Sequence, residues 1–354
     1  GEKVRPMSAV EGGSGSTGVS SRPMPGPAAS IAPTFLAIVG PTAAGKTRLS
    51  LEVARVLDGE IISMDSRQVY RGMDVGTAKA SLGERAAVPH HGLDILDPDV
   101  PYSAGEFARD ARRWIREIRG RGRIPLLVGG TGFYLKAVME PLFEEPPMDE
   151  ARRERLREYL ADLEGGRLEN WVERLDPARA DVAVEGGRQR MTRTLEVALL
   201  TGRPLSEWHE EDEGGQGAPG KGASGMPVDG RSTMRRWETD GIPALVVILT
   251  LDRDELDRRI RRRCERMVED GLVEEVDRLV RAGYTVDDPG LTGAGYREIA
   301  DHRSGSMDRN EALDRMEVRT RQYSRRQLTW FRNQVPEDAV SIDAEGPLED
   351  QVEQ

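Results

Sequence analysis

The residues best suited to chemistry in this 354-residue sequence occupy positions 40–47, which read GPTAAGKT. The two glycines allow backbone N–H groups to surround phosphate oxygens, the lysine adds a positive charge, and the final hydroxyl can ligate Mg²⁺. This P-loop pattern predicts a site for a diphosphate or triphosphate, and it does not by itself select ATP. We expect the phosphate contacts, with Thr47 as the metal ligand, to come from Gly40, Thr42, Ala43, Ala44, Gly45, Lys46 and Thr47.

A strand and a helix are predicted on the two sides of this loop. Residues 34–39 form an apolar, β-branched run, and Leu49, Val53 and Leu57 recur every fourth position after the loop. This spacing places the three apolar side chains on one face of a helix. The loop therefore has the strand-to-helix context that the motif requires.

Two further polar residues follow predicted strands. Asp65 comes directly after the run 60–64, and Thr131 follows the run 124–128 through a Gly-Gly turn. Because ligands bind at the carboxyl ends of strands in an open parallel sheet, both side chains are expected near the phosphate site. Asp65 has the chemistry of a general base, a water-mediated Mg²⁺ ligand or a helix N-cap, and Thr131 that of a catalytic hydroxyl or a cap. The residues alone leave these alternatives open.

The order of elements predicts an α/β fold with a doubly wound parallel sheet. Strands and helices alternate up to about residue 145, where helices separated by polar turns take over, and a buried strand at 244–251 returns the chain to the sheet. The expected parts are a disordered extension 1–33, a P-loop core 34–145, a helical insertion domain 146–240 with a flexible loop 209–237, a return strand with C-terminal basic helices 241–335, and an acidic tail 336–354.

The composition argues against a membrane protein, an internal disulfide and a zinc site. No apolar run approaches the ~18 residues needed to cross a bilayer, and there is no apolar leader at the N-terminus. The single cysteine, Cys264, allows no internal disulfide, and four histidines without clustered thiols argue against zinc. We therefore expect a cytoplasmic protein without a membrane partner that uses Mg²⁺ held by oxygen atoms. We also expect a monomer.

Arginines concentrate in two stretches although the net charge is −11. In the first, 258–266, Arg259 and Arg263 lie four residues apart and would neutralise a leaving diphosphate, whereas a solvated helix face is the alternative. In the second, 319–332, five arginines and no acid interleave with aromatic residues. That alternation suits a nucleic-acid backbone, although helix packing beside a solvated face would give the same pattern.

Several strings in the chain resemble the tRNA dimethylallyltransferase family, also called tRNA isopentenyltransferases. The resemblance spans about residues 35–333, and the strings after position 185 are absent from ordinary nucleotide kinases. The matching strings are GPTAAGKT at 40–47, DSRQVYRGMDVGTAK at 65–79, PHHGLDI at 89–95, VGGTGFYLKA at 128–137, RTLEVALLTGRPLSE at 193–207, GAGYREI at 293–299 and TRQYSRRQLTWFRN at 320–333.

The resemblance implies a reaction in which a dimethylallyl group moves from dimethylallyl diphosphate to the exocyclic amine of the adenine 3′ of the anticodon in tRNA. The P-loop, Lys46 and Mg²⁺ would stabilise the leaving diphosphate. Asp65 would accept the amine proton, Thr131 would orient the reacting groups, and the adenine would leave its stack. The resemblance thus makes Asp65, Thr131 and Lys46 the catalytic residues.

By matching strings, the resemblance also implies a set of tRNA contacts at the anticodon stem-loop. These are Asp65, Ser66, Arg67, Gln68, Thr131, Arg153, Gln189, Arg190, Met191, Thr192, Arg193, Gly295, Tyr296, Arg297, Arg325, Arg326, Gln327, Trp330 and Arg332.

Other functions remain open at this stage. An adenylate isopentenyltransferase would use the same core on free AMP, ADP or ATP, a small-molecule kinase would hold ATP in the P-loop, and an RNA-binding protein would need no catalysis. The helical insertion and the region 325–330 favour a macromolecular acceptor, because a free nucleotide needs no such footprint.

Overall fold

The computed structural model describes residues 35–140, 146–214 and 242–354, with side chains placed up to 209 in the second range. The extension 1–33 and the loop 209–237 beyond residue 214 were named from the sequence and lie outside the described residues. The three described ranges contain all the elements discussed below.

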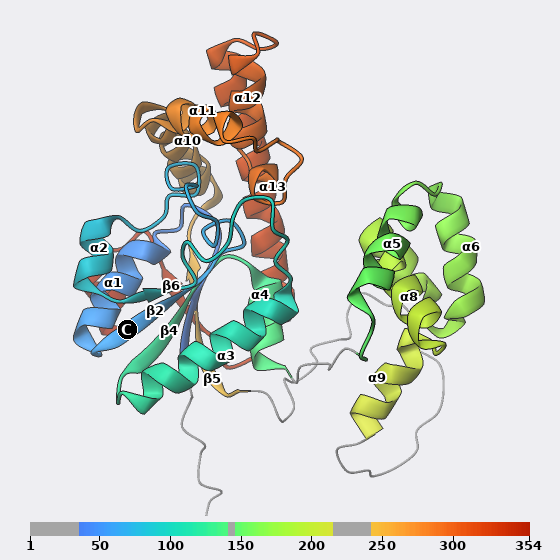
Figure 1. The fold of residues 1–354 in the computed structure, drawn as a ribbon. Helices are drawn as coiled ribbons and strands as arrows, with labels where there is room; N and C mark the ends of the chain where they lie inside the picture. Colours follow the sequence, from blue (N-terminus) through green and yellow to red (C-terminus); the bar gives the residue numbers. More distant parts are fainter. Residues whose placement is uncertain (1–34, 141–145, 215–241) are drawn as a thin grey trace, which may run out of the picture. The chain divides into compact units, whose positions relative to one another are not determined.

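A parallel sheet forms the centre of the core (Figure 1). Its strands lie in the order β3-β2-β4-β1-β5-β6, and every neighbouring pair is parallel. The strands are β1 (Phe35–Val39), β2 (Gly59–Met64), β3 (His90–His91), β4 (Ile124–Gly129), β5 (Ala244–Thr250) and β6 (Val340–Asp343). The strand order reverses at β1, which confirms the predicted doubly wound sheet.

Helices cover both faces of this sheet. Alternate residues of β1 separate the two layers, because Ala37 and Val39 join one apolar cluster and Ile38 joins another. The first cluster packs against α3, α4 and the end of α13, and the second packs against α1 and α14. The helices are α1 (Lys46–Val56), α2 (Leu82–Ala87), α3 (Ala104–Gly120), α4 (Gly132–Met139), α13 (Arg309–Gln334) and α14 (Leu348–Glu353).

A third apolar cluster joins α10 (Arg253–Glu269), α11 (Leu272–Arg281), α12 (Tyr296–Arg303) and α13. The polar loop after β2 is anchored in it through Val69, Tyr70 and Met73, all at most 2% exposed. This packing fixes a loop that has no regular structure of its own directly beside the P-loop.

Residues 336–354 differ from the acidic tail expected from the sequence. They form β6, which pairs with β5 through Val247 and Val340, and α14, whose Leu348 and Val352 pack on the α1 side of the sheet. Acidic residues dominated the composition, and they concealed a short alternation in which Ile342 and Ala344 are buried.

The helical insertion has a core of its own. Its helices are α5 (Glu150–Ala161), α6 (Gly165–Leu175), α7 (Ala180–Glu185), α8 (Arg188–Thr201) and α9 (Leu205–Gly214). Leu160, Leu168, Val172 and Leu195 are fully buried among them. Within the described ranges, no helix combines the length and apolar character that a bilayer crossing needs.

Candidate active site at the carboxyl end of the sheet

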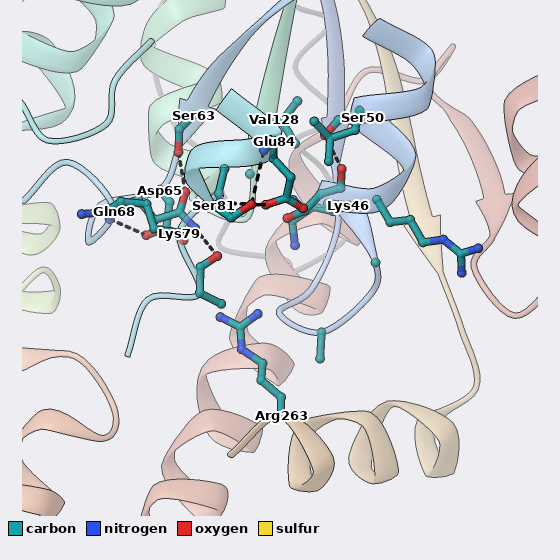
Figure 2. A pocket seen from close by; sticks show the side chains of 18 of the residues that line it. Lys46, Ser50, Ser63, Asp65, Gln68, Lys79, Ser81, Glu84, Val128 and Arg263 are labelled. Carbon is teal, nitrogen blue, oxygen red and sulfur yellow. Dashed lines mark hydrogen bonds between the residues drawn. The ribbon is translucent and has the colours of Figure 1, made fainter. Parts of the chain in front are cut away.

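Two adjoining cavities lie where β1, β2 and β4 end. The larger, of about 1510 Å³, is lined by the P-loop, the Gly129-Gly130 turn and the facing side of α10 (Figure 2). The smaller, of about 270 Å³, lies among the residues after β2, α10 and α13. Thr42, Asp65, Arg263 and Met267 line both cavities, so the two spaces meet at these side chains.

The P-loop presents an open surface to the larger cavity. Gly45 has a φ of 95°, a left-handed conformation that lets the loop turn into α1. A Cβ at Gly45 would meet no described atom within 4 Å, so a ligand can approach the backbone there. Lys46 Nζ donates to the carbonyls of Gly40 at 2.9 Å and Pro41 at 2.7 Å, and the Thr47 side chain is exposed beside it.

Two cations at this site have no carboxylate within ion-pair distance in the described residues. Burial and, to a lesser extent, the nearby charge of Arg263 lower the pKa of Lys46 to about 7, against an opposing effect of Asp65. Burial also lowers the pKa of Arg263, whose guanidinium reaches from α10 toward the cavity and donates to the Thr77 carbonyl at 3.3 Å. An anion bound here would restore the charge partner that both groups lack.

Asp65 stands at the junction of the two cavities. Its Oδ1 accepts from the backbone N–H of Arg67 at 2.8 Å and of Gln68 at 3.4 Å, which fixes the turn after β2. It therefore caps a turn and not a helix. Its Oδ2 accepts no hydrogen bond from any described residue, so one carboxylate oxygen is available to a substrate.

Thr131 precedes α4, and its hydroxyl makes no capping hydrogen bond. The helix-cap alternative for this side chain is therefore wrong. Its Oγ1 is buried and has no partner among the described residues, a state that costs about 1–3 kcal/mol for a polar group. The phenol of Tyr323 on α13 lies beside this hydroxyl: desolvation and the charge of Asp65 raise the pKa of Tyr323, and interaction with the Thr131 side chain opposes that rise.

The two arginines named from their spacing differ in their surroundings. Arg259 donates to Glu255 Oε1 at 2.8 Å and to the Ala344 carbonyl at 3.1 Å, although it lines the larger cavity. Arg263 has only the Thr77 carbonyl as a described partner. The geometry therefore favours Arg263 over Arg259 as the ligand of an anion.

Comparisons with known proteins identify the family of this chain. The sequence profile of the family described as IPP transferase matches residues 68–334. The chain belongs to the IPP transferase family. A tRNA dimethylallyltransferase of Geobacter sulfurreducens is 39% identical over 295 residues, covering 83% of this chain and 88% of its own length. One from Geobacillus thermodenitrificans is 39% identical over 303 residues, with coverages of 85% and 88%.

Solved structures of the same family share the fold. The tRNA isopentenylpyrophosphate transferase of Bacillus halodurans is 35% identical, with a TM-score of 0.60 over 90% of this chain and 93% of its own. A eukaryotic dimethylallyltransferase acting on tRNA has a TM-score of 0.68 at 24% identity, which extends the likeness of fold. As an IPP transferase, this protein is an enzyme of the transferase class.

Three side chains for which the resemblance implies tRNA contact are largely buried in this IPP transferase. Met191 is 5% exposed and packs in the core of the helical insertion. Tyr296 is 1% exposed, and its hydroxyl donates to Glu275. Gln327 is 6% exposed; its amide accepts from the Thr42 N–H at 2.8 Å and donates to the Gly130 carbonyl at 2.9 Å. All three side chains support neighbouring structure, and Gln327 and Tyr296 also line the larger and the smaller cavity, respectively.

The remaining predicted contacts of the core vary in accessibility. Arg297, Arg325, Arg326 and Arg332 are exposed, and Arg326 lies over the Tyr323 ring. Trp330 is half-buried and packs near the rings of Phe133 and Phe331. Ser66, Arg67 and Gln68 are partly buried in the turn after β2, and the Gly295 N–H donates to Glu298.

In the helical insertion, α8 carries most of the predicted contacts. Gln189 and Arg190 are exposed, whereas Thr192 and Arg193 are partly buried. Arg153 donates to the buried carboxylate of Glu196 at 3.1 Å, which makes it a packing partner of α8.

A buried acid that was not predicted from the sequence, Glu275, lies on α11. It accepts four hydrogen bonds from the loop after β2 and from Tyr296. The signal was present, because Glu275 lies between Leu272 and Leu279 on the apolar face of its helix.

Proposed function

We propose that this enzyme transfers a dimethylallyl group from dimethylallyl diphosphate to the exocyclic amine of the adenine 3′ of the anticodon in tRNA, releasing diphosphate. The observation that carries the proposal is the pair of unmatched cations, Lys46 and Arg263, beside a carboxylate with a free oxygen. Membership of the IPP transferase family and the names of its curated relatives support the same reaction.

The chemistry requires charge stabilisation on one side of the reacting carbon. As the allylic C–O bond breaks, negative charge develops on the diphosphate, and the P-loop amides, Lys46 and Arg263 are placed to stabilise it. The electron pair of that bond leaves with the diphosphate. These groups bind the charge more strongly as it develops, which favours the transition state over the bound substrate.

Proton transfer takes place on the other side. The adenine amine forms the new N–C bond, and its surplus proton passes to Asp65 Oδ2, the oxygen not used by the turn. The buried Thr131 hydroxyl, which lies beside Tyr323, can donate to or accept from the reacting groups. The smaller cavity offers a space where a flipped adenine would reach Asp65.

A divalent cation fits this site as a companion of the substrate. Among the described residues, no group of three or more His, Cys, Asp or Glu side chains is arranged to hold a metal ion, so these residues form no cage of their own. The exposed Thr47 hydroxyl, with diphosphate oxygens and water, matches the ligands that Mg²⁺ prefers. Bound there, Mg²⁺ would neutralise charge on the diphosphate.

The RNA surface that we propose includes the exposed arginines of α13. In the cytoplasm, a monomer would meet the anticodon stem-loop through these side chains. For Arg326→Ala, we expect weaker stem-loop binding and a plot of log affinity against log salt that is shallower by about one unit, because one fewer counterion is released. An unchanged slope would show that Arg326 makes no phosphate contact.

Transfer of radiolabel tests the proposed function. The enzyme is incubated with labelled dimethylallyl diphosphate and Mg²⁺, together with either an anticodon stem-loop RNA or AMP. We expect label in the RNA at the adenine 3′ of the anticodon. Label in AMP would instead identify an adenylate isopentenyltransferase, and absence of transfer to either would overturn the proposal.

A further inference from the structure

Glu275 is a fully buried carboxylate that forms no ion pair within the described residues. Its Oε2 accepts from the N–H groups of Asp74 and Val75, both at 2.8 Å. Its Oε1 accepts from the Gly76 N–H at 3.0 Å and from the Tyr296 hydroxyl at 2.8 Å. A buried charge is tolerated when hydrogen bonds satisfy both oxygens, and here four donors do so.

Helices α11 and α12 also pack against the backbone at Gly76. A Cβ at this position would lie 2.6 Å from the Tyr296 ring and 2.8 Å from Leu272 Cδ1, so no other residue fits without movement. Tyr296 therefore packs against the backbone whose N–H group Glu275 accepts. Three consecutive N–H groups and one peptide face are thus fixed by α11 and α12.

The next residue connects this clamp to the proposed active site. The Thr77 carbonyl accepts from the Arg263 guanidinium at 3.3 Å and from Gln68 Nε2 at 3.1 Å. Gln68 Oε1 in turn accepts from Ser63 Oγ at 2.8 Å, at the end of β2. The position of one carbonyl therefore sets the direction of Arg263 and supports the turn that carries Asp65.

We infer that Glu275 is a positioning residue for prenyl transfer, an inference that rests on the proposed function. It holds residues 74–76 so that the Thr77 carbonyl directs Arg263 toward the leaving diphosphate. Glu275 touches no substrate, and its effect passes through Arg263. Without the clamp, the loop relaxes and the guanidinium loses its fixed orientation, and misplacement of about 1 Å can cost 10²-fold in rate.

The variant Glu275→Gln tests this inference. The amide keeps one acceptor oxygen and turns an NH₂ group toward backbone donors, so the clamp is broken with little change in volume. We expect kcat to fall about 100-fold with little change in KM for the RNA, and inorganic pyrophosphate to bind more weakly. Loss of a negative charge alone would strengthen pyrophosphate binding, so charge and positioning predict opposite signs.

The matched control is Glu60→Gln. Glu60 is also a buried glutamate, and it lies at the amino end of β2, away from the proposed active site. It should lower stability and leave kcat unchanged. A wild-type kcat in Glu275→Gln, or an equal loss in Glu60→Gln, would overturn the inference.

A double-mutant cycle separates positioning from general destabilisation. If Glu275 acts through Arg263, adding Glu275→Gln to Arg263→Ala should cost less than about threefold in kcat, far below its effect in the wild type. Full additivity would contradict the inference. Absence of transfer by the wild-type enzyme would instead remove the proposed function, which makes the two failures distinguishable.

Hydrogen exchange of the wild-type enzyme tests the clamp without a variant. The N–H groups of residues 74–76 should exchange slowly although they lie in a loop, because a buried carboxylate accepts all three. Exchange as fast as in exposed loops would contradict the clamp even if Glu275→Gln failed to fold.

Discussion

Buried charges near the two ends of β2 differ in whether they have a partner of opposite charge. At the amino end, Glu60 is 3% exposed and accepts from Arg121 at 2.7 Å and from His91 at 2.7 Å. Burial alone would raise the pKa of Glu60, but the hydrogen bonds from Arg121 and His91 lower it to about 2. Near the carboxyl end, Lys46 of the P-loop and Arg263 of α10 have no carboxylate partner within ion-pair distance among the described residues, and their pKa values are lowered.

This difference separates structural charge at one edge of the sheet from functional charge at the other. A complete set of partners makes the ionised form of Glu60 the stable form, so that site contributes to folding. Cations without partners cost stability, and they persist where a ligand supplies the missing charge. The comparison assigns the carboxyl end to anion binding on physical grounds that do not depend on the motif.

The largest effect is expected from Asp65→Asn. Asparagine keeps an oxygen that can accept from the Arg67 N–H, so the turn survives while the base is lost. Turnover in the labelled-transfer assay should fall by about 10²–10⁴-fold, the usual contribution of a general base. Stem-loop affinity should stay near the wild-type value. Turnover within a few-fold of wild type would remove Asp65 from the role of base.

A second prediction ranks two arginines of α10. Arg263→Ala should lower kcat by about 10²–10³-fold, as expected when a donor to developing negative charge is lost. Arg259→Ala should cost less, because that guanidinium is already engaged by Glu255 and the Ala344 carbonyl. Steady-state kinetics of the two variants give both values of kcat. An equal loss, or a larger loss for Arg259→Ala, would contradict the proposed difference between paired and unpaired cations.

The pH dependence of pyrophosphate binding tests Lys46. With a pKa of about 7, this lysine is mostly neutral at pH 8 in the free enzyme, and bound pyrophosphate would restore its proton. The contribution of Lys46 to affinity should therefore fall about tenfold from pH 6 to pH 8. Calorimetry on wild type and Lys46→Met isolates this contribution from the ionisation of pyrophosphate itself. If affinity changed with pH equally in the wild type and in Lys46→Met, Lys46 would not titrate between pH 6 and pH 8.

The smallest effect concerns stability at the other end of the strand. Because the pKa of Glu60 is lowered in the folded state, its contribution is fully present above about pH 4.5 and is lost as the pH falls toward 2. Glu60→Gln should lower the free energy of unfolding by about 2 kcal/mol at pH 7, discounted for the exposure of Arg121. Urea unfolding at pH 7 and pH 3 should show the difference shrinking. A constant difference would contradict the assigned ion pairs.

The sheet and the P-loop could be predicted from the sequence, because the spacing of apolar residues and the residues of a glycine turn are both local features of a few positions. The buried partners could not be predicted in this way. Tyr296 and Gln327 occur in strings shared with the family, yet their hydrogen bonds reach partners far away in the sequence. The strand β6 was hidden by acidic composition, and the cap alternative for Thr131 was removed only by the three-dimensional arrangement.

The most direct test of the account is a crystal structure of the enzyme with stem-loop RNA and a non-reactive thiolodiphosphate analogue of dimethylallyl diphosphate. We expect diphosphate oxygens on Lys46 and Arg263, with the adenine amine within hydrogen-bond distance of Asp65 Oδ2. A diphosphate held away from these two cations, or an amine out of reach of Asp65, would contradict it.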